Sequence, residues 1–184
     1  MFQGDEPIYR IIIPGREIPK WFRHQSVGTS MSLQVPLDKL KGVAMCVVFV
    51  LRQHHPLHQL RLDDVGTYKV THWLRCYLKA DIYERDAIIF PFSEEFGKIE
   101  SCHLFLGYYP YKSFDQELKE NWSQVDANGF NQIEIGFETE GLGLEVTKCG
   151  GRWVYEQDIE DLNQIMHGCN ENDLEDSAKD TKTE

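Results

Sequence analysis

Short runs of hydrophobic residues recur along the chain, separated by turn-forming residues. Val43–Leu51 is continuously apolar, which is typical of a central strand buried on both faces. Tyr68–Leu78 alternates, so one face of that strand is expected to be covered and the other amphipathic. Further strands are expected at Ile8–Ile13, Met31–Val35, Ile88–Phe90, Cys102–Tyr109, Ile133–Phe137, Leu142–Lys148 and, after a turn at Gly150-Gly151, Arg152–Tyr155. About nine strands without alternating helices predict a sandwich or a barrel.

One helix is predicted, at Asp158–Met166. Ile159, Leu162, Ile165 and Met166 share a face, and Asp158 is placed as the N-cap. The residues after Cys169 are polar and acidic, with too few apolar side chains to offset the entropy of ordering. The expected organisation is a leader or cloning remnant over residues 1–7, a β-domain over 8–169 and a disordered acidic tail over 170–184. The almost immediate start of the first strand predicts a module excised from a longer protein.

Composition narrows the class of protein. The 184 residues are 41% hydrophobic and 27% charged, as in an ordinary globular domain, and no apolar run approaches the ~20 residues of a membrane span. The net charge of −11 argues against nucleic acid as a partner. The first 80 residues carry 11 basic and 6 acidic groups, whereas residues 81–169 carry 6 basic and 18 acidic groups. Faces of opposite sign are therefore expected.

The cysteines indicate a reducing compartment. Five are present, an odd number without a C-x-x-C pair, in mostly apolar surroundings, so buried reduced thiols are predicted. No secretory signal opens the chain. A cytosolic or nuclear protein is expected.

No catalytic, metal or cofactor site is predicted. His54 and His58 have the i, i+4 spacing of zinc ligands on a helix, but Pro56 between them disfavours that helix and no cysteine or carboxylate completes the set. No serine lies in a nucleophile-elbow frame. Gly141-Leu142-Gly143 precedes a strand rather than a helix, so it is interpreted as a tight turn and not a phosphate loop.

Two long polar stretches, Arg52–Gly66 and Tyr111–Asn131, are the predicted variable surface, because loops of that length are usually functional or mobile. Trp122, between Asn121 and Ser123, is the tryptophan most expected to be exposed. The residues predicted to make binding contacts from these loops are His54, His55, His58, Arg61, Lys112, Phe114 and Trp122.

The strongest motif lies near the start of the chain. It reads Ile13-Pro14-Gly15-Arg16-Glu17-Ile18-Pro19-Lys20-Trp21-Phe22-Arg23-His24-Gln25-Ser26-Val27-Gly28-Thr29-Ser30 and continues to Pro36. Locally, Pro14-Gly15 makes a turn, and Pro19 begins a short helical turn that lets Ile18, Trp21 and Phe22 anchor against the core. Taken whole, the motif resembles the signature of the C-terminal jelly-roll/immunoglobulin-like (C-JID, post-LRR) domain of plant TIR-type nucleotide-binding leucine-rich-repeat immune receptors.

The resemblance runs from residue 8 to residue 158 and includes Cys149-Gly150-Gly151-Arg152-Trp153. Ser101-Cys102-His103 stands where that family more often has Ser-Asp-His. The resemblance implies an antiparallel jelly-roll/Ig-like β-sandwich that is not itself an enzyme. The signature residues expected to be structural are Pro14, Gly15, Glu17, Ile18, Pro19, Trp21, Phe22, Gly28, Cys149 and Gly150.

The resemblance also implies a role. Such a domain acts with the adjoining leucine-rich repeats to bind a pathogen effector protein, after which the full-length receptor oligomerises and a separate TIR domain cleaves NAD. Two alternatives stay open: a structural cap on the end of the repeat solenoid, whose last apolar face needs covering, and a carbohydrate-binding jelly roll suggested by the architecture and the aromatics.

Overall fold

The computed structural model describes residues 9–34, 39–51, 70–80, 82–93, 102–122, 132–141 and 143–168. The strands are β1 (Tyr9–Pro14), β2 (His24–Val27), β3 (Ser30–Gln34), β4 (Gly42–Leu51), β5 (Val70–Ala80), β6 (Tyr83–Ser93), β7 (Cys102–Pro110), β8 (Gln132–Glu140) and β9 (Leu144–Val154). Helical segments are η3 (Tyr111–Ser113), α1 (Gln116–Trp122), η4 (Glu156–Asp158) and a helix over residues 159–168.

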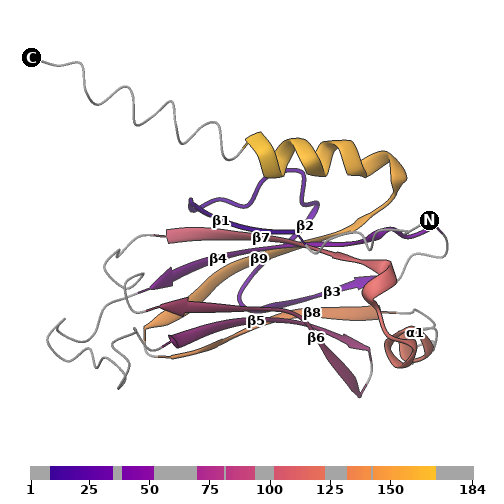
Figure 1. The fold of residues 1–184 in the computed structure, drawn as a ribbon, viewed down its shortest axis with the longest axis horizontal. Helices are drawn as coiled ribbons and strands as arrows, with labels where there is room; N and C mark the ends of the chain where they lie inside the picture. The colour runs from indigo at the N-terminus through magenta and orange to yellow at the C-terminus, as the bar shows by residue number, and fades with distance from the viewer. Residues whose placement is uncertain are drawn as a thin grey trace, which may run out of the picture.

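The described strands form two stacked antiparallel sheets (Figure 1). Sheet A has the order β1-β7-β4-β9-β2, and sheet B has the order β3-β8-β5-β6. This confirms the predicted all-β sandwich with a short C-terminal helix. The core between the sheets contains Val47 and Phe49 of β4, Phe105 of β7 and Leu74 of β5, all at 0% exposure.

Sheet A is covered on its outer face as well. Cys46 and Leu106 pack there against Phe22, Leu162 and Met166, in a second buried cluster. The helix over residues 159–168 lies across this face in Figure 1. Coverage on both sides is why β4 reads as a continuous apolar run, as predicted for a central strand.

Sheet B has an outer face open to solvent. On β5, Leu74, Cys76 and Leu78 point into the core at 0% exposure, while Trp73 and Arg75 point outward. The alternation predicted for this strand is confirmed. The same alternation continues onto β8, where Ile133, Ile135 and Phe137 are buried and Glu138 is exposed.

The structure corrects the expected turn at Gly150-Gly151, because β9 runs unbroken from Leu144 to Val154. Glycine is favoured at both positions because neighbouring side chains leave little room for a Cβ. A Cβ on Gly150 would lie 3.1 Å from Cγ2 of Ile18, and a Cβ on Gly151 would lie 2.8 Å from Cδ1 of Ile135. Strand β2, which was not predicted, pairs with β9 at the edge of sheet A, and its polar sequence His-Gln-Ser-Val gave no apolar signal.

Two further expectations change at the helices. Tyr111–Asn131 is not a loop throughout, because it begins with η3 and α1. Asp158 is not the N-cap of the C-terminal helix: it ends η4, and its Oδ2 accepts a hydrogen bond from the backbone N–H of Tyr155 at 2.9 Å. The predicted apolar face is confirmed, since Leu162 and Met166 are buried. The expected leader and the expected acidic tail lie outside the described residues.

Candidate functional site

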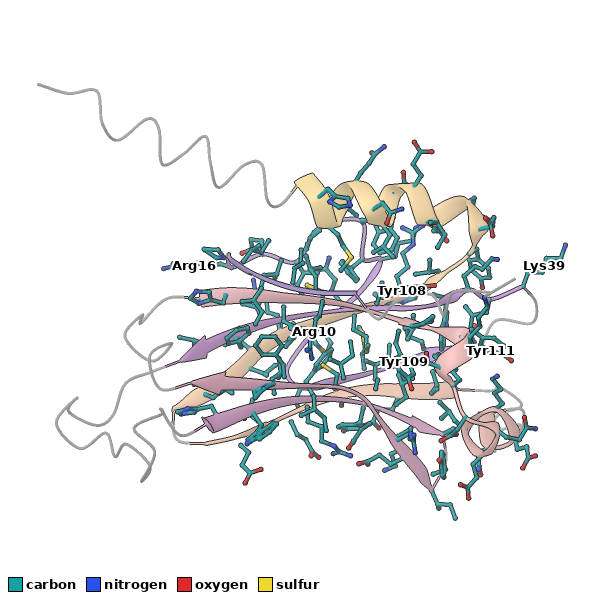
Figure 2. The ribbon with its side chains drawn as sticks, viewed as in Figure 1. Arg10, Arg16, Lys39, Tyr108, Tyr109 and Tyr111 are labelled. Atoms are coloured by element: carbon teal, nitrogen blue, oxygen red, sulfur yellow. The ribbon has the colours of Figure 1, made fainter. Side chains whose placement is uncertain are left out.

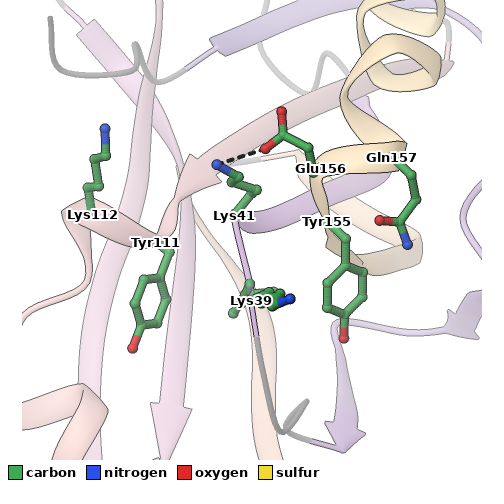
Figure 3. A pocket seen from close by; sticks show the side chains of 8 residues that line it. Lys39, Lys41, Tyr111, Lys112, Tyr155, Glu156 and Gln157 are labelled. Carbon is green, nitrogen blue, oxygen red and sulfur yellow. Dashed lines mark ion pairs between the residues drawn. The ribbon is translucent and has the colours of Figure 1, made fainter. Parts of the chain in front are cut away.

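One end of sheet A brings three chain segments together. The first residue of β4, Gly42, pairs with the last residues of β7 and β9, Pro110 and Val154. The pairing continues one residue outward, because the carbonyl of Lys41 accepts from Tyr111 N–H at 2.7 Å and Lys41 N–H donates to the Val154 carbonyl at 2.8 Å. Beyond the strands, segments 39–41, 111–112 and 155–157 line a hollow of about 670 Å³ (Figure 3).

This hollow, the strand-end hollow, is mainly cationic. Among the described residues that line it, Lys39, Lys41 and Lys112 contribute ammonium groups, and Glu156 contributes a single carboxylate. Lys41 Nζ lies 2.8 Å from Glu156 Oε2, and both side chains are exposed, at 41% and 78%. Lys39 and Lys112 form no ion pair with any residue that the structure describes. The hollow therefore has an excess of positive charge on an acidic protein.

Two tyrosine rings form the apolar part of its walls. Tyr111 packs against Phe114, with ring centroids 5.4 Å apart, and Lys119 Nζ lies 4.4 Å from the Tyr111 centroid. On the other side, burial and then the nearby Asp158 raise the pKa of Tyr155 above its ordinary value. In Figure 3, the side chain of Lys39 is seen between the two rings.

Lys39 also has an unusual backbone. Its φ of 57° lies in the left-handed region, where it is the one non-glycine residue among those described. This conformation is disfavoured for a residue with a Cβ and persists where the surrounding structure holds it. Figure 2 shows Lys39 extending outward, at the end of the molecule opposite Arg16.

Helix α1 stands beside this end and has a clear local cause. Asp115 Oδ1 accepts from Leu118 N–H at 2.8 Å, the geometry of an N-cap. Tyr83 O–H donates to Asp115 Oδ2 at 2.7 Å, and Arg85 Nε lies 3.4 Å away. Burial alone would raise the pKa of Asp115, but these hydrogen bonds and the Arg85 charge hold it below its ordinary value. An acidic N-cap followed by the good helix formers Gln-Glu-Leu-Lys-Glu is the sequence signal that finds α1.

The residues predicted to make contacts fall into four groups. Lys112 is exposed in η3 and lines the strand-end hollow. The prediction that Phe114 makes binding contacts was wrong, because its side chain is 3% exposed and its ring stacks on that of Tyr109, with ring centroids 5.3 Å apart. Trp122 is the last residue of α1 rather than part of a loop. His54, His55, His58 and Arg61 lie outside the described residues.

The signature residues lie together around β9. Ile18 and Phe22 are buried directly above Gly150, and Phe22 N–H closes the turn predicted at Pro19 by donating to the Pro19 carbonyl at 3.0 Å. Cys149 is buried at 0% exposure on the opposite face of β9. This packing explains why the two motifs occur in one chain: the first covers the second.

The remaining signature residues fix the ends of that segment. Pro14 ends β1, and Gly15 N–H donates to the Cys102 carbonyl at 3.1 Å. Glu17 pairs with Lys148 at 3.1 Å. Gly28 has a φ of 120°, which favours glycine at the crossing from sheet A to sheet B.

Arg152 links the signature to the helix that follows. Its guanidinium lies 4.4 Å from the ring centroid of Trp21, its Nη1 donates to the Trp21 carbonyl at 2.8 Å, and its Nη2 donates to Asp158 Oδ1 at 2.8 Å. Of these partners, only Trp21 belongs to the predicted set. Through Trp21 and Asp158, Arg152 connects the signature segment to η4.

A second, smaller hollow of about 400 Å³ lies on the open face of sheet B, between Trp73, Ile89, Glu138 and Glu140. Trp73 and Ile89 are large apolar side chains with 39% and 43% exposure. Arg75 at its edge is bound by the carboxylates of Glu84, Asp86 and Glu138. Among the described residues that line it, the carboxylates of Glu138 and Glu140 outnumber the single cation, Arg75, so the two hollows differ in the sign of their charge.

The described residues contain no group of three or more His, Cys, Asp or Glu side chains placed to hold a metal ion. None of the helices described has the length and apolar character needed to cross a membrane.

Comparison with known proteins decides the family. The model of the C-JID domain matches residues 13–160. The chain belongs to the C-JID family. The match includes both motifs from which the resemblance was inferred, and it confirms that inference.

Several curated relatives of this C-JID domain come from Arabidopsis thaliana. Disease resistance protein RPS4B is 28% identical over 175 residues, which is 85% of this chain and 14% of the relative. Disease resistance protein RPP2B is 25% identical over 178 residues, again 85% and 14%. Disease resistance protein LAZ5 is 26% identical over 149 residues, 78% of this chain and 12% of the relative. The chain thus spans about one seventh of the length of the relatives it matches.

Proposed function

We propose that this C-JID domain is a non-catalytic recognition module of a plant intracellular TIR-type nucleotide-binding leucine-rich-repeat receptor, in the cytoplasm, the nucleus or both. It acts with adjoining leucine-rich repeats to bind a pathogen effector protein, and binding allows the full-length receptor to oligomerise and start the defence response. Membership of the C-JID family and similarity to disease resistance proteins support this proposal.

The observation that carries the proposal is the strand-end hollow. Its three segments extend from the central strands β4, β7 and β9, whose backbones are paired across the sheet. Exposed contact residues held at the ends of a rigid sheet can vary without disturbing the core beneath them. Lys112, predicted as a contact residue, lies there. His54, His55, His58 and Arg61, which lie outside the described residues, remain proposed contacts of the same kind.

The open face of sheet B favours a second candidate function, that of a structural cap. Trp73 and Ile89 are exposed side by side on it, and exposed apolar patches often mark contact surfaces. Under this alternative the face would cover the end of the leucine-rich repeats, and effector would not touch the domain.

The two functions separate in the full-length receptor, co-expressed in leaf tissue with a library of secreted pathogen proteins and assayed by cell death and co-precipitation. One variant combines Lys39→Glu with Lys112→Glu at the strand-end hollow. A matched control combines Lys20→Glu with Arg23→Glu, which makes the same charge change at exposed positions outside the hollow. A third variant combines Trp73→Ser with Ile89→Ser.

Recognition at the hollow predicts that the first variant loses cell death and effector co-precipitation at unchanged receptor abundance, while the matched control responds normally. A cap predicts instead that only the third variant fails, and that it fails with every effector and accumulates poorly. A normal response from the hollow variant would contradict the proposed contact site.

A further inference from the structure

We propose that the strand-end hollow binds an acidic segment of the partner protein, with carboxylate side chains seated on Lys39, Lys112 and Lys41. The inference rests on the proposed function for the partner being an effector. The chemistry of the hollow is independent of the proposed function and can be tested on the 184-residue chain alone.

The structure already contains one example of the binding mode. Glu156 Oε2 lies 2.8 Å from Lys41 Nζ inside the hollow. Glu156 is 78% exposed, so little holds its carboxylate there apart from the lysine. An incoming carboxylate can therefore replace Glu156 on Lys41, and Glu156 acts as an internal competitor for that position.

Charge complementarity selects the partner. Lys39 and Lys112 add two ammonium groups that no described carboxylate neutralises. The whole chain has a net charge of −11 despite these lysines, so the protein repels acidic segments elsewhere and draws them to this end. The excess of cations over carboxylates makes a basic segment a poor occupant.

The size and walls of the hollow favour a peptide over a small ion. A volume of about 670 Å³ is many times the ~30 Å³ that one water molecule occupies in the liquid. The rings of Tyr111 and Tyr155 provide apolar walls for the aliphatic parts of side chains. A free inorganic anion would use the charges and leave these walls without contacts.

Part of the site is preorganised. The backbone of Lys41 is fixed on both sides, by Tyr111 N–H and by the Val154 carbonyl, and the backbone of Lys39 is held at a φ of 57°. Ordering a loop on binding reduces affinity, so fixed backbones retain more of the electrostatic attraction.

The test is a titration of the isotope-labelled chain with tetraglutamate peptide, followed by amide chemical shifts in NMR. Inorganic phosphate and tetralysine serve as comparison probes. Tetraglutamate is expected to shift Lys39, Lys41, Tyr111 and Lys112 first, and to lose its effect at about 1 M salt, where the screening length is about 3 Å. Phosphate binding without tetraglutamate binding would overturn the proposal of an acidic protein segment.

Two variants and one control test the assignment within the hollow. Lys39→Gln combined with Lys112→Gln is expected to weaken tetraglutamate binding by about fivefold or more. Glu156→Gln is expected to strengthen it by about twofold to threefold, because the competitor on Lys41 is gone. Lys148→Gln removes one positive charge, half of what the double variant removes, from a lysine outside the hollow that is paired with Glu17, and should leave binding unchanged.

Weaker binding in Glu156→Gln would overturn the proposed competition on Lys41. A loss in Lys148→Gln equal to that of the double variant would overturn the proposal in favour of general electrostatic attraction. The outcome is independent of the receptor assay. Suppose that the variants change peptide binding as expected, while the receptor variant at Lys39 and Lys112 still causes cell death. The hollow would then remain a site for acidic segments, but the effector would be rejected as its occupant.

Discussion

Arg152 and Asp158 form an ion pair in which Arg152 Nη2 lies 2.8 Å from Asp158 Oδ1, with side-chain exposures of only 15% and 9%. The pair joins β9 to η4, and through the second amino group of Arg152 it also holds the Trp21 carbonyl. It therefore fixes the course of the chain between the signature segment, the sheet and the C-terminal helix.

Breaking this pair should be costly. Arg152→Met leaves the carboxylate of Asp158 largely buried without its partner, so we expect the free energy of unfolding to fall by about 3 kcal/mol. Urea denaturation measures it. Lys148→Met breaks the exposed pair with Glu17 and should cost at most about 1 kcal/mol. Equal costs for the two variants would show that burial does not set the strength of the Arg152 pair.

Gly42 is required where β4 begins beside the strand-end hollow. A Cβ at this position would lie 2.5 Å from the Tyr109 carbonyl oxygen and 2.7 Å from Cε2 of Tyr108. Backbone cannot yield as a flexible side chain can, so Gly42→Ala should lower stability by about 1–3 kcal/mol. Gly168→Ala is the control, because nothing lies within 4 Å of its Cβ. Thermal melting of both variants distinguishes a local steric cost from a general intolerance of alanine.

The N-cap of α1 should be replaceable by another cap but not by alanine. Asp115→Ala removes the acceptor for Leu118 N–H and is expected to cost about 1–2 kcal/mol, whereas Asp115→Ser keeps an acceptor and should restore most of it. Amide hydrogen exchange of Leu118 reports on the cap directly. Fast exchange at Leu118 in the native protein would contradict the assignment.

Alkaline pH should destabilise the fold. Burial raises the pKa of the Cys149 thiol from an ordinary 9.0 to about 11. The unfolded thiol therefore loses its proton first, and the stability that is fully present below about pH 9 is lost as pH rises towards 11. Burial, followed by the hydrogen bond to Glu134, raises the pKa of Tyr77 to about 12, which extends the decline.

Urea midpoints measured from about pH 7 to about pH 11 test this dependence. The native protein should show a midpoint that changes little below pH 9 and then falls. Cys149→Ala should reduce the fall between pH 9 and pH 11, because alanine has no proton to lose. The remaining fall is expected from Cys76 and Tyr77, whose pKa values burial also raises. A midpoint that falls equally in this variant would assign the effect to other groups.

The pattern of apolar residues along the chain was sufficient to predict the strands that bury at least one face. Val43–Leu51 and the alternating strand through Leu74 and Leu78 were predicted because their burial appears in the order of apolar residues. Strand β2 was not, because His24–Val27 joins the sheet edge through backbone hydrogen bonds while its side chains stay mostly exposed. An edge strand of polar residues leaves no hydrophobic pattern.

Contacts between segments that are distant in the sequence mark a second limit of prediction from sequence. Gly150-Gly151 has the composition of a turn, yet each glycine is present because another layer approaches within contact distance. Distances between layers cannot be read from one segment. Lys112 was predicted from its polar surroundings, but Lys39 and Lys41 come together with it only because three strand ends coincide. Phe114 was misassigned because its burial depends on Tyr109 and Tyr111, which fold back over it.

The order of strands in sheet A has a consequence for synthesis on the ribosome. Strand β4 emerges early, but one of its neighbours is β9, the last strand described, and β2 attaches to the sheet only through β9. The apolar residues of β4 therefore lack one of their two neighbouring strands until Val154, the last residue of β9, has left the ribosome. If the chain is released before that point, β4 remains paired on one side only and is prone to aggregation. Premature stop codons in this domain should be cleared by quality control rather than yield shortened receptors.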